Sequence, residues 1–158
     1  MAGAARVVTR SRSGFTLHLG EDERQVVTRL LTELRTMQSD DEAAEATARL
    51  FPVVHPERPD QEAEYQRLMR SELIESRAAG IDTAVEVLSR PGRKVSLSES
   101  ELLAFSRAVN SVRLVLGTIL EVTEDDDIDA PPELTDSPEY QLYAYLSYVL
   151  DACVRALS

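Results

Sequence analysis

The sequence has 158 residues, 43% of them apolar, and its 28 acidic and 17 basic side chains give a net charge of −11. This length and apolar content predict one folded domain over residues 1–158, and the excess of acid argues against a protein that binds DNA tightly without a partner. No apolar run reaches the ~18–20 residues of a membrane-spanning helix and no signal-peptide core is present, so we expect a soluble, cytoplasmic protein with no membrane partner.

Residues 5–19 are predicted to form a β-hairpin. β-prone side chains lie on both sides of a turn at Ser11–Gly14, and because an isolated hairpin is marginally stable in water, it must pack on helices. The first twenty residues carry no acid, and their three bases are Arg6, Arg10 and Arg12, so the rest of the chain carries −14. These arginines either protect the exposed edge of the hairpin or form a small basic patch for an acidic partner.

Residues 21–122 are predicted to form a helical core. A first helix begins at the acids of residues 21–23, which suit a helix N-terminus, and its apolar stripe comprises Val27, Leu30, Leu34 and Met37. A shorter alanine-rich helix is expected from Ser39 to Leu50, and a long one from Asp60 to Arg90. His55 lies between them in a proline-rich connector. Because the other histidine is distant in sequence and the chain has one cysteine, we expect no metal site.

The domain is expected to be organised around an apolar helix from Ser96 to Val122, which follows the turn signal Pro91-Gly92. Ser96 and Ser98 each begin a Ser-x-x-Glu capping box, and we expect Arg93 and Lys94 just before them to be solvated. Helical spacing predicts one apolar face, widened by neighbouring leucines and Val115, that runs along Phe105, Val109, Val112, Leu116 and Ile119. A helix with so wide an apolar face must be covered on several sides, so it is expected at the centre of a bundle.

An acidic loop and a final helix complete the chain. Residues 121–139 hold nine acids and no base. Residues 123–136, which include Asp125, Asp126 and Asp127, are therefore expected to form a solvated, hinge-like or partner-facing loop. The last helix is expected over residues 137–157, with a proline in its first turn and a buried face comprising Leu142, Leu146, Val149, Cys153 and Leu157. Two of its tyrosines, Tyr143 and Tyr148, are candidates for a partner surface at the margins of that face.

The predicted fold is therefore mainly α: a helical bundle around a central apolar helix, with an N-terminal β-hairpin. No glycine-rich phosphate loop, nucleophile elbow, paired metal-ligand motif or CxxC occurs in the sequence. We therefore expect neither an enzyme nor a protein with a cofactor.

Arg113 and Cys153 are the two side chains whose chemistry conflicts with their apolar surroundings. Arg113 must be paired or must reach solvent, and we expect an internal ion pair, with Asn110 as a further hydrogen-bond partner, in preference to a ligand-binding arginine. Cys153 is a candidate redox residue. Since the chain has no second cysteine, thiol sensing would need an intermolecular bond or another oxidised form.

Several motifs resemble those of a known family. They are Arg6-Val7-Val8, Gly14-Phe15, Leu50-Phe51-Pro52, the run from Glu64 to Arg70, and above all the run from Val112 to Thr118 leading to Val122–Asp126. Together they span nearly the whole chain and resemble the actinobacterial oxidative stress transcriptional regulator AosR family, formerly a domain-of-unknown-function family. The resemblance implies a cytoplasmic regulator of redox-responsive transcription that acts through RNA polymerase or a sigma factor.

Two classes of function remain open. The first is a non-enzymatic regulatory module that binds protein partners or further copies of itself through candidate interaction residues, namely Arg6, Arg10, Arg12, Arg113, Asp125, Asp126, Asp127, Tyr143 and Tyr148. The second is a small-molecule sensor or cryptic enzyme with a pocket around Arg113. A closed bundle with Arg113 internally paired favours the first class, whereas a cavity with unpaired polar groups around Arg113 favours the second.

Overall fold

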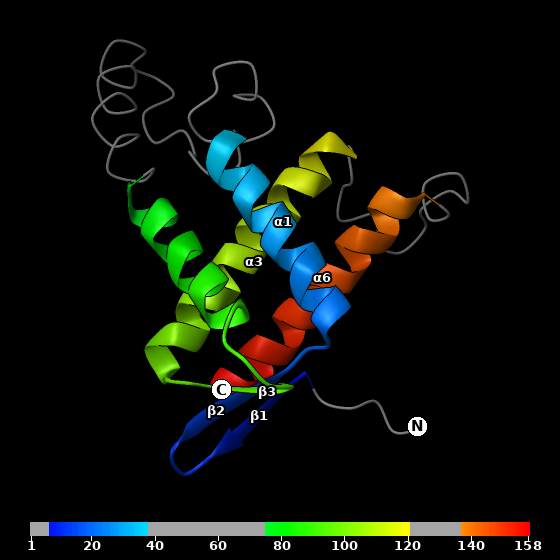
Figure 1. The fold of residues 1–158 in the computed structure, drawn as a ribbon. Helices are drawn as coiled ribbons and strands as arrows, with labels where there is room; N and C mark the ends of the chain where they lie inside the picture. The colour runs from blue at the N-terminus through cyan, green and yellow to red at the C-terminus, as the bar shows by residue number, and fades with distance from the viewer. Residues whose placement is uncertain (1–6, 38–74, 121–136) are drawn as a thin grey trace, which may run out of the picture.

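The computed structural model describes residues 7–37, 75–120 and 137–158 (Figure 1). In chain order these form β1 (Val8–Ser11), β2 (Gly14–His18), α1 (Glu21–Met37), a helix over residues 75–88, β3 (Lys94–Leu97), α3 (Glu99–Ile119) and α6 (Pro138–Leu157). The fold is mainly helical, with an N-terminal antiparallel hairpin and a central apolar helix, which confirms the predicted fold class. The predicted helix over 39–50, His55, the 123–136 loop and Arg6 lie outside the described residues.

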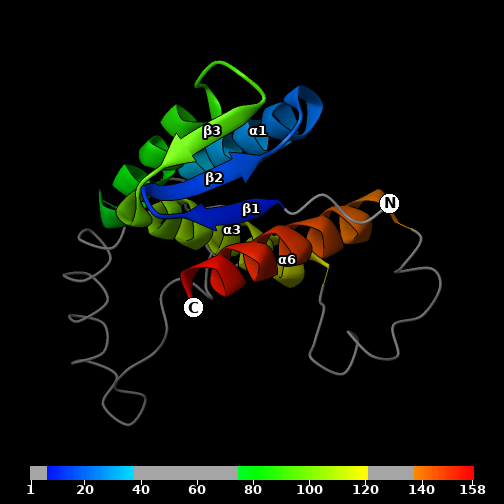
Figure 2. The same ribbon diagram turned by 90° about the horizontal axis from the view of Figure 1, so that it is seen from below.

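The predicted hairpin is part of a three-stranded antiparallel sheet in the order β1-β2-β3. Leu17 of β2 is opposite Val8 of β1 and Val95 of β3, and all three side chains are buried. The helices cover the face of the sheet to which these side chains point (Figures 1 and 2). The sheet therefore has one buried face, as the alternating burial along β2 and β3 requires.

Strand β3 lies inside the segment that the sequence predicted to be a purely helical core, and it was missed for a physical reason. It has four residues, of which Val95 and Leu97 are buried and Lys94 and Ser96 are exposed. A four-residue alternation is a weak local signal, and the partner that stabilises it, β2, lies far away in sequence. Ser96 therefore belongs to a strand, and the prediction that it starts the central helix was wrong.

Gly14 allows β2 to lie between the other two strands. It follows the two-residue turn Arg12-Ser13 and has φ 141°, a conformation that other residues rarely adopt. A Cβ atom at this position would lie 2.9 Å from the carbonyl oxygen of Leu97 in β3. The close approach of β3 thus requires glycine at the start of β2.

The central helix α3 begins at the second of the two predicted capping boxes. Ser98 Oγ accepts a hydrogen bond from the backbone N–H of Glu101 at 3.1 Å, and the Ser98 N–H donates to Glu101 Oε1 at 2.8 Å. The buried face includes Leu102, Phe105 and Val109, all 0% exposed. The predicted face was wrong at its far end, because Ile119 is 56% exposed in the last turn.

Helix α6 packs along α3 and also contacts β1 (Figure 2). Ser137 caps it, accepting a hydrogen bond from the Tyr140 N–H at 3.1 Å, and Pro138 occupies the first turn. Leu146, Val149 and Cys153 are fully buried, as predicted from their spacing. Tyr145 Oη donates to Glu23 at 3.0 Å and so joins α6 to the first turn of α1.

The helix over residues 75–88 covers another side of the core. Its buried face comprises Ile81, Ala84, Val87 and Leu88, and Ala84 and Val87 are 0% exposed. Residues 60–74 of the predicted long helix lie outside the described ranges.

Helix α3 has the length and composition of a membrane-spanning helix, with 21 residues and a mean hydropathy of 1.3 in its most apolar stretch. The expectation that no segment reaches this length was therefore too strict. Half of that stretch is buried inside the protein, where α3 contacts α6, α1 and β2. These contacts make α3 a core helix of the described fold.

Candidate functional site

Arg113 is held inside the bundle by polar contacts to its own helix and to α6. Its Nε donates to Ser147 Oγ at 2.7 Å, and its NH1 donates to Asn110 Oδ1 at 3.4 Å. The guanidinium also lies over the Tyr143 ring, 5.2 Å from the ring centroid. Within the described ranges no carboxylate pairs with Arg113. The partners are thus a hydroxyl, an amide and an aromatic ring in place of the expected ion pair.

Of the two tyrosines predicted at a partner surface, one is buried and one is accessible. Tyr143 is 7% exposed and covered by Arg113, whereas Tyr148 is 49% exposed. Tyr148 and Arg10 line a cleft of about 470 Å³ between β1 and the end of α6. Arg10 donates to the Ser158 carbonyl at 3.4 Å and lies 5.8 Å from the centroid of the Phe15 ring. Arg12 is exposed in the hairpin turn, so it does not meet Tyr143 or Arg113.

The remaining predicted candidates contribute little to a common site. Asp125, Asp126 and Asp127 lie outside the described residues, as Arg6 does. Cys153 is 0% exposed, and its burial raises the pKa of the thiol to about 12. The thiol is therefore protonated at neutral pH and has low nucleophilicity.

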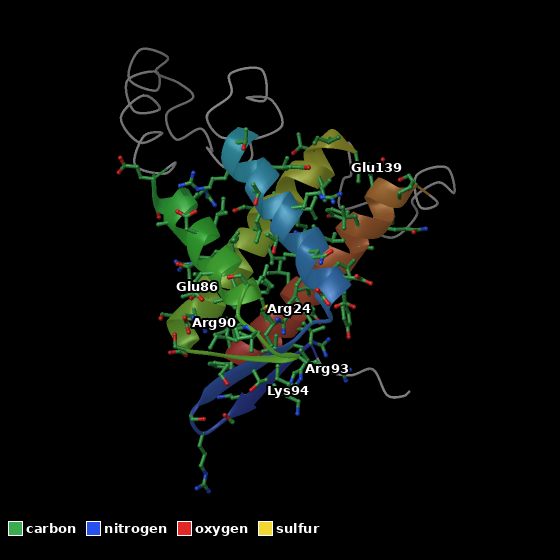
Figure 3. The ribbon with its side chains drawn as sticks, viewed as in Figure 1. Arg24, Glu86, Arg90, Arg93, Lys94 and Glu139 are labelled. Atoms are coloured by element: carbon green, nitrogen blue, oxygen red, sulfur yellow. The ribbon has the colours of Figure 1, made fainter. Side chains whose placement is uncertain are left out.

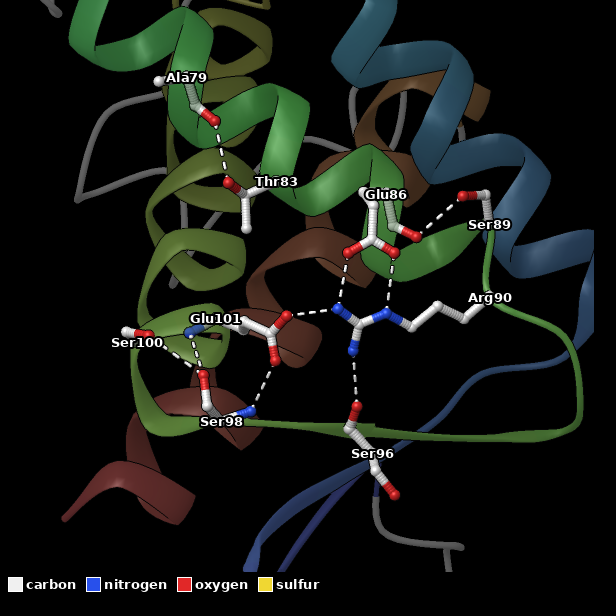
Figure 4. A network of polar contacts seen from close by, with 9 residues as sticks. All are labelled: Ala79, Thr83, Glu86, Ser89, Arg90, Ser96, Ser98, Ser100 and Glu101. Atoms are coloured by element: carbon white, nitrogen blue, oxygen red, sulfur yellow. Dashed lines mark hydrogen bonds and ion pairs between the residues drawn. The ribbon is translucent and has the colours of Figure 1, made fainter.

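Arg90 forms a polar cluster that the sequence analysis did not identify (Figure 4). Its Nε and NH2 bind the two carboxylate oxygens of Glu86 at 2.8 and 2.6 Å, its NH2 also binds Glu101, and its NH1 donates to the Ser96 carbonyl at 2.8 Å. These hydrogen bonds lower the pKa of both carboxyl groups and raise the pKa of Arg90. The cluster joins the 75–88 helix to β3 and α3. Among the contacts of Arg90, only the pair with Glu86 could have been predicted from the sequence, because residues four apart are neighbours on a helix.

A basic groove lies beside this cluster, between the start of α1 and the turn before β3. We define it by five cationic side chains, Arg24, Arg29, Arg90, Arg93 and Lys94, and one carboxylate, Glu21, which line an open groove of about 1340 Å³. Figure 3 shows Arg24, Arg90, Arg93 and Lys94 at the same end of the molecule. Arg93 and Lys94 are exposed, as expected from the sequence. No sequence pattern indicated that α1 brings further arginines beside them.

Arg24 is the part of the basic groove whose position is fixed. Its Nε donates to the Leu19 carbonyl at 3.0 Å, and its NH1 donates to the Arg90 carbonyl at 2.9 Å. Its NH2 is buried and has no hydrogen-bond partner among the described residues. The two carbonyls therefore fix the guanidinium at the side of the groove, while the buried NH2 does not face solvent.

A smaller cavity of about 300 Å³ lies between the 75–88 helix and α3. It is lined by Arg77, Arg107 and Ser111, among others. Arg77 NH1 donates to Ser111 Oγ at 3.0 Å, its Nε is buried without a partner, and burial lowers the pKa of its guanidinium. Among the residues that the structure describes, no three His, Cys, Asp or Glu side chains form a metal-binding group.

The chain was compared with known proteins at the level of families, curated sequences and solved structures. A family model with the description "Domain of unknown function (DUF2017)" matches residues 4–157. No curated protein matches, and no solved structure matches.

Proposed function

We propose that this chain, which belongs to the family described as Domain of unknown function (DUF2017), is a non-enzymatic, cytoplasmic regulator of oxidative-stress-responsive transcription. It acts by binding protein partners such as RNA polymerase or a sigma factor. The stress response and the transcription machinery come from the resemblance of its motifs to the AosR family. The structure supports only the proposed mode of action, namely that the protein binds partners and does not catalyse a reaction.

The observation that carries the proposal is the packing of Arg113 between two helices. Two of its three guanidinium nitrogens donate to Ser147 and Asn110, and the guanidinium covers Tyr143. None of the three cavities described above is lined by Arg113. An arginine used in this way orients two helices, and its remaining donors do not face a cavity that could hold a substrate. This geometry favours a binding module over a sensor or enzyme built on Arg113.

The proposal is tested by purifying the tagged full-length chain from its native host before and after peroxide stress and identifying co-eluting proteins by mass spectrometry. RNA polymerase subunits or a sigma factor should be enriched over a matched tag-only control. Transcript profiling of a deletion strain should show altered expression of peroxide-induced genes. Recovery of no transcription protein, together with an unchanged peroxide response, would reject the proposal.

A second candidate function is small-molecule sensing. The candidate pocket lies at Arg77 and not at Arg113, where the sequence suggested it. The cavity at Arg77 has a volume at the lower end of the ~300–1,000 Å³ range of ligand pockets and contains an unpartnered guanidinium nitrogen. It would accept a small carboxylate or phosphate. A screen of anionic metabolites by thermal shift, with Arg77→Gln as the insensitive variant and the exposed Arg35→Gln as the control, distinguishes this function from the first.

A further inference from the structure

The basic groove has a charge opposite to that of the protein that carries it. The chain has a net charge of −11, yet five cationic side chains and one carboxylate line this groove. Most of the acids therefore lie elsewhere, and the groove is a local region of positive potential on an acidic molecule. Such a region attracts and orients an anionic partner, an effect that weakens as salt increases.

Not every cation in the groove is available to a partner. Arg90 forms ion pairs with Glu86 and Glu101, so its charge is neutralised within the protein and its main effect is to hold neighbouring residues in place. Arg29, Arg93 and Lys94 are exposed, and within the described part of the chain their side chains form no ion pair or hydrogen bond. Arg24 also lines the groove and is held in place by two backbone carbonyls. The groove thus combines three exposed charges with one arginine whose position is fixed.

The size and surroundings of the groove distinguish among anions. Its volume of about 1340 Å³ exceeds the ~300–1,000 Å³ typical of small-ligand pockets, and it lies open to solvent. The nearby helix N-terminus is not a phosphate site, because Glu21, Asp22 and Glu23 already occupy its first turn. A polynucleotide carries its phosphates well beyond the groove and so meets the net negative charge of the rest of the protein. A short acidic segment of another protein confines its carboxylates to the groove, fills more of the open volume than a small anion does, and needs no helix N-terminus.

We infer that the basic groove is a docking site for an acidic segment of a partner protein, with Arg29, Arg93 and Lys94 contacting its carboxylates. This inference rests on the proposed function, since it names the surface through which the regulatory protein binds a partner. Arg90 is a positioning residue, because it fixes the turn that carries Arg93 and Lys94.

Fluorescence anisotropy with a labelled oligoglutamate peptide and the purified full-length chain tests the inference. The variant is Arg93→Glu with Lys94→Glu, and both side chains are exposed, so folding is retained and is checked by thermal melting. The matched control is Arg35→Glu with Arg155→Glu, which changes the net charge equally at exposed positions outside the groove, and its folding is checked in the same way. The groove variant should weaken binding by about tenfold or more, and the control by about twofold or less.

The other outcomes overturn the inference. Equal weakening by both variants would show a long-range charge effect without a docking site. Displacement of the peptide by inorganic phosphate would indicate a small-anion site, and tighter binding of an oligothymidine than of the peptide would indicate a nucleic-acid surface. Absence of saturable binding to the wild-type chain also rejects it.

Purification from the host separates this inference from the proposed function. If the groove variant recovers the same transcription proteins as the wild type, the proposed function stands and the docking site is wrong. If the groove binds the peptide as expected but no transcription protein co-elutes with the wild-type chain, the docking site stands and the proposed function is wrong.

Discussion

Arg90 and Glu101 form an ion pair that joins the end of the 75–88 helix to the first turn of α3. The same guanidinium binds Glu86 and the Ser96 carbonyl, so one side chain connects two helices and strand β3. Glu101 also completes the capping box of α3. The start of the central helix is therefore fixed both by its local sequence and by an arginine eleven residues away.

Replacing Arg90 should destabilise the protein and remove part of its acid sensitivity. Arg90→Ala loses hydrogen bonds to Ser96 and Glu101, so its free energy of unfolding should fall by about 1–2 kcal/mol in total. Arg90→Lys should recover only part of this free energy, since an ammonium group cannot reproduce the forked contacts of a guanidinium. Chemical denaturation at neutral pH measures both values. A loss of stability no larger than that of the exposed control Arg107→Ala would contradict this role for Arg90.

The pH dependence of the same variant follows from the sign of the carboxyl shift. Hydrogen bonds from Arg90, and then from Ser98, lower the pKa of Glu101 below its ordinary value of 4.5. A carboxyl with a lowered pKa in the folded state stabilises that state above the ordinary pKa, and this stabilisation is lost as the pH falls through the lowered value. The stability gap between wild type and Arg90→Ala should therefore narrow below pH 4.5. A gap that widens in acid would contradict the assignment.

The two Ser-x-x-Glu motifs provide a matched pair of cap variants. Ser98→Ala removes the acceptor for the Glu101 N–H and should cost about 1 kcal/mol of unfolding free energy. Ser96→Ala alters an exposed side chain of β3 and should change stability by less than about 0.5 kcal/mol. Parallel urea titrations measure the difference. A loss for Ser96→Ala as large as that for Ser98→Ala would contradict the assignment of Ser98 as the cap of α3.

A buried and an exposed position on α3 test the location of the core. Val112 is 5% exposed, so Val112→Asp places a carboxylate in the core at a cost of several kcal/mol, on the order of the total stability of a domain. Cooperative unfolding should be lost. Ile119→Asp, at 56% exposure on the same helix, should retain a normal melting transition. A cooperative transition near the wild-type temperature in Val112→Asp would show that the core is misplaced.

Cys153 should behave as a packing residue. Because burial raises the pKa of its thiol to about 12, alkylation should be slow in the native protein and fast after denaturation. Arg155 lies two residues away and pairs with Asp151 at 2.8 Å, so it does not activate the sulfur. Cys153→Ala should fold, with a loss of about 1 kcal/mol from the smaller side chain.

Two results would favour thiol sensing over packing at Cys153. One is native labelling as rapid as that of free cysteine. The other is a disulfide-linked dimer formed by peroxide at low protein concentration. Either would make Cys153 the direct redox sensor of the proposed regulator.

Binding to duplex DNA should be weak when no partner is present. Residues 21–158 carry a net charge of −14, which repels the phosphate backbone. Non-specific binding depends on cationic groups that displace phosphate counterions. A salt titration with a promoter fragment should give no tight complex at physiological ionic strength. A nanomolar, salt-sensitive complex formed by the isolated chain would contradict this.

The sequence alone determined the elements whose signals are local. The helices over 21–37 and 138–157 begin within a residue of where acids, serine and proline predicted, because capping and first-turn charge act within one turn. The hairpin followed from β-prone residues on both sides of a short turn. Buried faces were correct at Phe105, Leu146 and Cys153, since helical spacing fixes which side chains share a side.

Only the tertiary structure decided what depends on residues far apart in sequence. Strand β3 forms by pairing with β2. Arg113 of α3 contacts Ser147 and Tyr143 of α6. The basic groove brings two arginines of α1 next to Arg93 and Lys94. No short-range sequence pattern predicts these long-range contacts, because the partner of a side chain depends on which elements pack together. Packing is set by burial of apolar faces over the whole chain, whereas polar and charged groups take the partners that packing brings within reach.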